Sequence, residues 1–140
     1  MKKFLTLILC VIGLSAFAQK EQKDIRYYYY NLNQDQHFMD YIKARKTFDL
    51  KKTEFLLPKS EAALKELKEN ESKILRNERS YTEFLTKYNM KNAGEYARLW
   101  FAQLTALKTF LKKNPEFSQL TATERQNIID KWYYSDVASN

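Results

Sequence analysis

The chain has 140 residues, and its 24 lysines and arginines exceed its 17 acidic residues, so the formal net charge is +7. One histidine and one cysteine exclude a site built from several His and Cys ligands. The lysines alternate with acidic residues, as in Lys65-Glu66-Leu67-Lys68-Glu69, instead of forming the basic blocks typical of nucleic-acid-binding tails. We therefore expect a basic protein with no metal, no cofactor and no nucleic-acid partner.

Residues 1–18 have the form of a cleavable secretory signal. Two lysines precede an apolar run from Phe4 to Leu14, and Ala-Phe-Ala closes the segment. The run has about eleven residues, whereas a membrane anchor, the alternative, needs roughly twenty. With Gln19 next, the segment resembles secretory signals of Gram-negative bacteria. This resemblance implies that the protein is periplasmic or extracellular after cleavage.

The rest of the chain, residues 19–140, is expected to form a single helical domain. Cleavage removes Cys10, so no disulfide can form and a hydrophobic core must hold the fold. Cys10 also lies inside the apolar run and not at its end, which disfavours lipid attachment there. About 120 residues suffice for one core and are too few for two domains.

Few turn signals follow the signal segment, which predicts an all-α protein. The first predicted helix runs from about Asp35 to Leu57, although polar residues interrupt its apolar pattern. After Pro58, Ser60 is a plausible N-cap for one long helix that continues to Tyr88. The apolar positions of this helix are spaced by three, four and seven residues: Leu64, Leu67, Ile74, Tyr81, Leu85 and Tyr88.

Two further helices complete the predicted fold. An amphipathic run from Gly94 ends at Asn114, where Pro115 stops it. Thr121 begins a Thr-x-x-Glu capping box, which predicts a short helix over residues 122–134. Together, the four segments predict a small antiparallel helical bundle of about four helices, with room for an extra turn at the N-terminus.

Consecutive aromatic residues are the most unusual feature after the signal segment. Successive side chains on a helix are about 100° apart, so a run of them cannot face the core entirely. Exposed aromatic side chains are typical of recognition surfaces. Core packing is the alternative interpretation. The candidate partner-binding residues are Tyr27, Tyr28, Tyr29, Tyr30, Trp132, Tyr133 and Tyr134.

Four charged residues fall within or beside the apolar stripes: Arg45, Asp49, Glu71 and Glu78. We expect a structural ion network in which Arg45 pairs with Glu71 or Glu78 across a helix contact. In the alternative, all four lie at the bundle margin and reach water.

Catalytic chemistry has few candidate groups in this chain. His37 is the only histidine, and no serine has the glycines of a nucleophile elbow. A paired-carboxylate hydrolase needs only two acids, but it would require a cleft that holds Glu71 or Glu78 away from any arginine.

We therefore expect a non-catalytic interaction module that binds a protein or peptide, as chaperones, inhibitors and immunity factors do. The alternative is an envelope- or lipid-surface-associated protein, because basic amphipathic helices suit anionic membranes. The paired-carboxylate hydrolase is the third hypothesis. The oligomeric state stays open.

Overall fold

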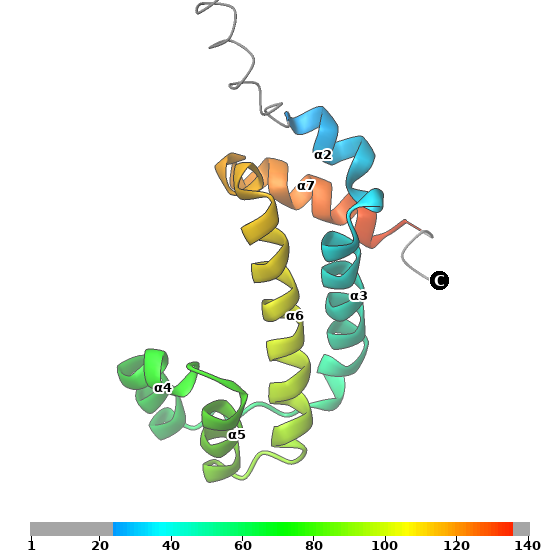
Figure 1. Cartoon of the computed structure of the whole chain (residues 1–140). Helices are drawn as coiled ribbons and strands as arrows, with labels where there is room; N and C mark the ends of the chain where they lie inside the picture. Colours follow the sequence, from blue (N-terminus) through cyan, green and yellow to red (C-terminus); the bar gives the residue numbers. More distant parts are fainter. Residues whose placement is uncertain (1–23, 136–140) are drawn as a thin grey trace, which may run out of the picture.

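The computed structural model describes residues 24–135 (Figure 1), so the predicted signal segment, residues 1–18, lies outside the described residues. The described part is all-α and contains no strand, which confirms the predicted class. It has six α-helices where about four were predicted, and the four-helix antiparallel bundle is not confirmed. The helices are α2 (Ile25–Asn31), α3 (Gln36–Lys51), α4 (Glu61–Ile74), α5 (Glu78–Lys87), α6 (Ala93–Lys113) and α7 (Ala122–Tyr133), and the 3-10 turns are η1 (Leu32–Gln34), η2 (Lys52–Glu54) and η3 (Pro115–Gln119).

The predicted helix from Ser60 to Tyr88 is two helices. Asn70 already leaves helical geometry, with φ −125° and ψ 22°. Asn77 then starts α5, because its side-chain oxygen accepts a hydrogen bond from the Ser80 amide at 2.9 Å. The apolar spacing continues across the break, since Ile74 and Tyr81 are seven residues apart. The periodic pattern therefore does not reveal that the helix is interrupted.

The predicted helix from Asp35 to Leu57 is shorter than expected. Asp35 is its N-cap and accepts hydrogen bonds from the next amides, but α3 ends at Lys51 and one 3-10 turn follows. The Phe55 side chain is buried, but its backbone is extended and not helical. The extra N-terminal turn is a full short helix, α2, which is capped by Asp24.

The last two predicted helices agree with the structure within one residue at each end. Helix α6 ends at Lys113, and Pro115 directly follows its C-cap, Asn114. At the start of α7, the Glu124 amide donates to Thr121 Oγ1 at 3.2 Å, and the Thr121 amide donates to Glu124 Oε2 at 2.8 Å. The capping box therefore forms as predicted.

Helices α3 and α6 form a long antiparallel pair that runs the length of the molecule (Figure 1). Helices α2 and α7 cross one end of this pair, and α4 and α5 lie at the other end. Within residues 24–135, no helix has both the length and the apolar character that a bilayer crossing requires.

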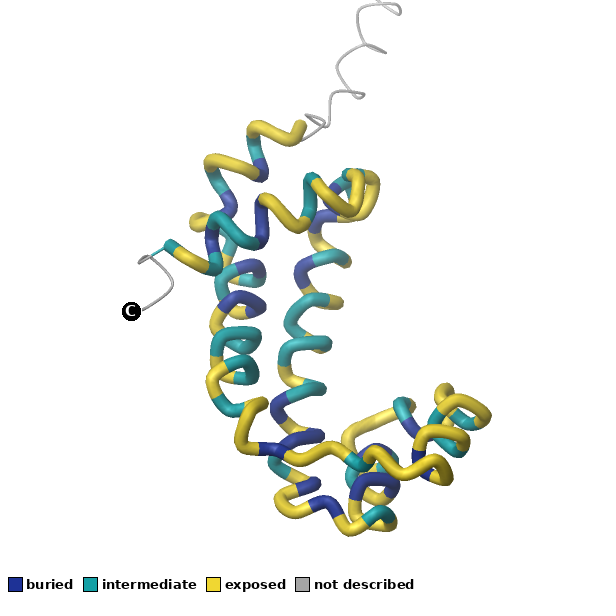
Figure 2. The backbone as a smooth tube through the Cα atoms, turned by 180° about the vertical axis from the view of Figure 1, so that it is seen from behind, coloured by how far each residue is buried: buried dark blue, intermediate teal, exposed yellow. Residues whose placement is uncertain are grey.

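Each end of the α3–α6 pair has its own hydrophobic core, and Figure 2 shows buried residues concentrated at the two ends. At the α2–α7 end, the Phe38 and Phe110 rings meet with their centres 5.2 Å apart. At the α4–α5 end, Tyr81 contacts Tyr96 and Trp100, with ring centres 6.1 and 5.2 Å away. The two ends of the molecule therefore have separate cores that are joined by two shared helices.

Candidate functional site

The structure brings the two terminal aromatic runs together where α2 and α7 meet. The Lys131 ammonium donates a hydrogen bond to the backbone carbonyl of Tyr29. Its nitrogen lies 4.0 Å from the ring centre of Tyr29, 4.8 Å from that of Tyr30 and 4.5 Å from that of Trp132. Distances below about 6 Å are typical of cation–π attraction. Lys131 therefore joins rings that are about a hundred residues apart in the chain.

Two of the seven candidate aromatic residues are core residues. The exposed fraction of Tyr28 is 0% and that of Trp132 is 6%. The Tyr28 ring packs edge-on against Phe117, and the Trp132 indole N–H donates to the Tyr28 carbonyl at 3.4 Å. Burial, together with the nearby negative charge of Glu116, raises the pKa of Tyr28 to about 12. Because a partner cannot reach these two side chains, the structure removes them from the candidate binding surface.

Three other members of the two runs are exposed. The exposed fractions are 39% for Tyr29, 65% for Tyr30 and 79% for Tyr134. Tyr29 and Tyr30 pack edge to face with ring centres 5.1 Å apart, and Tyr134 packs in the same way on Tyr133 at 5.0 Å. Tyr27 is only half-buried. We call Tyr29, Tyr30, Tyr134 and Lys131 the aromatic surface.

Sequence reasoning missed two contributors to this end of the molecule. Ile25 is 40% exposed and precedes Tyr29 by four residues on α2, so the two side chains share a helix face. The N-cap Asp24 was the local signal that could have identified this helix. Lys131 had no such signal, because its role depends on the contact with α2.

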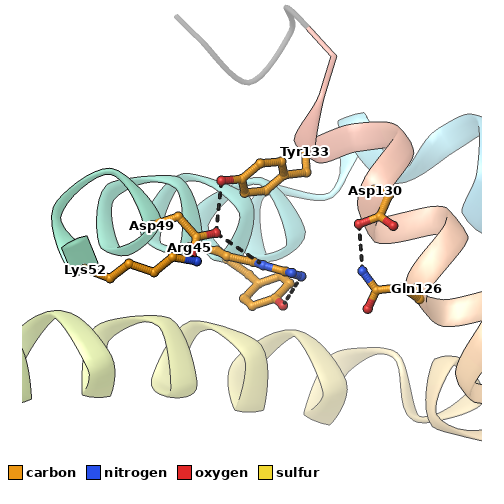
Figure 3. Close-up of polar contacts among 7 residues, drawn as sticks. Arg45, Asp49, Lys52, Gln126, Asp130 and Tyr133 are labelled. Atoms are coloured by element: carbon orange, nitrogen blue, oxygen red, sulfur yellow. Dashed lines mark hydrogen bonds and ion pairs between the residues drawn. The ribbon is translucent and has the colours of Figure 1, made fainter. Parts of the chain in front are cut away.

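Arg45 and Asp49 belong to a polar network that joins α3 to α7 (Figure 3). Arg45 Nε lies 3.8 Å from Asp49 Oδ2, and Arg45 Nη1 donates to the Tyr41 hydroxyl at 3.3 Å. Asp49 also accepts hydrogen bonds from the Tyr133 hydroxyl at 2.9 Å and from Lys52 Nζ at 2.7 Å. Tyr133 is therefore a linking residue, and its ring also lies 5.4 Å from the Arg45 guanidinium carbon.

The network stabilises the ionised form of Asp49. Desolvation opposes the negative charge, but the hydrogen bonds from Lys52 and Tyr133 outweigh it and lower the pKa of Asp49. Burial and the same bond to Asp49 raise the pKa of Tyr133. The carboxylate thus stays charged and the phenol stays a donor near neutral pH.

The other two members of the predicted ion network lie elsewhere. Glu71 is exposed on α4, and Glu78 is exposed at the first residue of α5. Among residues 24–135, the ion pair of Arg45 is with Asp49 and not with either glutamate. The expected pairing assumed one continuous helix through Glu71 and Glu78, and the break before Asn77 removes that premise.

Glu78 lines a groove of about 410 Å³ between α3, α5 and α6, together with Arg98, His37 and Asp40. The hydrolase reading required a glutamate held away from any arginine, and Arg98 shares this groove. Within the described residues, no three His, Cys, Asp or Glu side chains are grouped closely enough to hold a metal ion.

No family model matches the chain, and neither the curated proteins nor the solved structures include a significant match. The function is therefore argued from the geometry of this chain.

Proposed function

We propose that the protein is a secreted or periplasmic helical module, non-catalytic, that binds a protein or peptide through the aromatic surface. One observation carries the proposal: two distant aromatic runs meet around Lys131, where Tyr29 and Tyr30 are exposed, and Tyr134 is exposed three residues further along the chain. A chain that needed these rings only for its core would bury them, as it buries Tyr28 and Trp132.

The arrangement of the rings supports recognition. A tyrosine offers a large apolar ring and a hydroxyl that can still bond to a polar partner. Its side chain has only two rotatable bonds, so little conformational entropy is lost on binding. Here the edge-to-face pairs Tyr29–Tyr30 and Tyr133–Tyr134 restrict the motion of the rings further. The surface is thus organised before a partner arrives, which favours affinity.

The neighbouring charges support the same role. Arg26 is exposed on α2, and the Lys131 side chain lies against the rings of the aromatic surface. Aromatic residues and arginine are enriched where proteins bind one another. Chaperone-, inhibitor- and immunity-like modules all work by such binding, without chemistry of their own.

Affinity capture from the envelope of expressing cells tests the proposal. The tagged wild-type protein is compared with the double variant Tyr30→Ser/Tyr134→Ser, and captured proteins are identified by mass spectrometry after a high-salt wash. We expect one stoichiometric protein partner with the wild type and at least about tenfold less of it with the double variant, because interface tyrosines often contribute more than 1 kcal/mol each.

Leu50→Ser is the matched control, since Leu50 is 80% exposed on α3 and outside the aromatic surface. It should retain the partner. Equal recovery with the wild type and the double variant, or no stoichiometric partner at all, contradicts the proposal.

A further inference from the structure

The end of the molecule opposite to the aromatic surface exposes a second group of apolar side chains. The exposed fraction is 86% for Leu56, 42% for Leu57 and 55% for Leu64. Figure 2 shows the connection from α3 to α4, which carries the first two leucines, as a mostly exposed stretch across the near side of this end. Adjacent leucines at this level of exposure are unusual in a folded chain and indicate a contact with something else.

The fold holds these leucines outward. Phe55, directly before them, is buried and its ring centre lies 5.3 Å from that of Tyr96. On the other side, the Ala63 amide donates to the Ser60 hydroxyl at 3.2 Å, and Ala63 is 1% exposed. Both flanks of the segment are therefore fixed, so the leucines between them cannot turn into the core.

Helix α4 extends this exposed region. Its main packing partner is α5, and within its fourteen residues only Ala63 and Ile74 are buried. Leu64 is not part of the core and lines a hollow together with three lysines and two glutamates, Lys59, Lys65, Lys68, Glu61 and Glu69. The outer side of α4 thus combines an apolar residue with lysines on an amphipathic helix.

The charge around the leucines distinguishes between possible partners. The lysines of the hollow outnumber its two glutamates, Glu61 and Glu69. Glu69 lies 4.0 Å from Lys65, while Lys59 and Lys68 have no ion-pair partner among residues 24–135. Lysine is depleted in the cores of protein interfaces but is attracted to anionic lipid headgroups, which its long stem can reach while leucine enters the acyl region. A lipid surface fits this combination better than a protein groove.

We infer that Leu56, Leu57 and Leu64, with Lys59, Lys65 and Lys68, form a leucine–lysine surface that docks on an anionic lipid bilayer. The leucines insert at the boundary between headgroups and acyl chains, and the lysines lie at the headgroups. This inference is independent of the proposed function, because the aromatic surface is at the other end of the α3–α6 pair (Figure 1).

Vesicle co-sedimentation of the protein, as processed by the expressing cell, tests the inference. Vesicles of phosphatidylglycerol and phosphatidylcholine in equal parts are compared with vesicles of phosphatidylcholine alone. We expect several-fold stronger binding to the anionic vesicles and a loss of this preference at high salt. The double variant Leu56→Ser/Leu57→Ser should bind at least about tenfold more weakly, since two inserted side chains are removed.

A second variant, Lys59→Glu/Lys68→Glu, keeps the leucines and reverses two charges, so it should lose the anionic preference specifically. Tyr134→Ser, at the other end, should bind as the wild type does. Thermal unfolding shows whether each variant is folded. If the leucine variant does not fold, the charge variant decides the test.

Three results would overturn the inference: no binding of the wild type to anionic vesicles, equal binding of wild type and both variants, or equal binding to both kinds of vesicle. Sedimentation equilibrium is run in parallel. A dimer that the leucine variant abolishes, without lipid binding, assigns the surface to a second copy of the chain instead.

Discussion

At the scale of single residues, Asn114 makes the most consequential polar contact. It is buried, with an exposed fraction of 1%, directly before Pro115 at the end of α6. Its side-chain amide donates to Asp35 Oδ2 at 2.8 Å and to the Phe110 carbonyl at 3.3 Å. The other oxygen of Asp35 caps α3 by accepting from the amides of residues 37 and 38. One side chain therefore ties the end of α6 to the start of α3.

Replacing this residue tests the link. Asn114→Ala leaves the Asp35 carboxylate without its donor from α6, and losing a buried partner of a charged group costs about 1 to 3 kcal/mol. We expect that loss in the free energy of unfolding, measured by urea denaturation. Asn33→Ala, at an exposed position, is the control and should stay within about 0.5 kcal/mol of the wild type. A similarly small effect of Asn114→Ala would refute the role assigned to Asn114.

At the scale of elements, α3 and α7 depend on each other through Asp49 and Tyr133. The two residues are 84 positions apart and share a 2.9 Å hydrogen bond. Lys131 makes the corresponding link between α7 and α2, which has seven residues and is too short to be a stable helix alone. Helix α7 therefore organises its end of the molecule, and its contacts decide which tyrosines remain exposed.

The lowered pKa of Asp49 predicts how this link depends on pH. A carboxyl group whose pKa is lower in the folded state contributes stability above its unfolded pKa of about 4, and this is lost as pH falls through the folded value. We expect Asp49→Asn to be about 1 kcal/mol less stable than the wild type at neutral pH, because the group is partly exposed and screened. The difference should shrink as the pH falls below about 4.

Chemical denaturation across this pH range measures the effect. Tyr133→Phe removes one donor to the carboxylate and should reproduce part of the same pH dependence. A difference between Asp49→Asn and the wild type that is constant with pH would contradict a contribution from the charge of Asp49.

At the scale of the whole molecule, two cores share one pair of helices. Helix α6 contributes Tyr96 and Leu99 to one core and Phe110 to the other, whereas the fully buried residues of α4, Ala63 and Ile74, belong to a single core. Local stability follows the amount of buried packing. The end that carries the leucine–lysine surface therefore includes a helix with little buried packing.

Native-state hydrogen exchange tests whether α4 is locally less stable than α6. We expect amides in the middle of α4 to exchange at least about tenfold faster than amides of α6 near Tyr96 and Phe110, because α4 can open without unfolding the α3–α6 pair. Helix α5, which packs on α6, is the internal control and should be intermediate. Equal protection of α4 and α6 would show that the molecule opens only as one unit.

Local sequence patterns were enough to predict the helical class, the C-terminal end of α6 and the start of α7. Pro115 and the Thr121–Glu124 capping box act within a few residues, so their effect does not depend on the rest of the fold. The break before Asn77 was also encoded locally, in a residue that caps helices well, but the apolar spacing across it concealed the signal.

Which residues make up the candidate surfaces depends on how the helices pack against one another. Tyr28 and Tyr30 are alike in sequence, but Tyr28 packs against Phe117 of η3 in the core, whereas Tyr30 contacts Lys131 at the surface. Arg45 pairs with Asp49 and lies against the Tyr133 ring. It does not pair with Glu71 or Glu78, because the breaks between successive helices determine where each helix lies. Lys131 reaches Tyr29 across 102 positions. Contacts over such separations depend on how helices pack together, and no local pattern in the sequence records them.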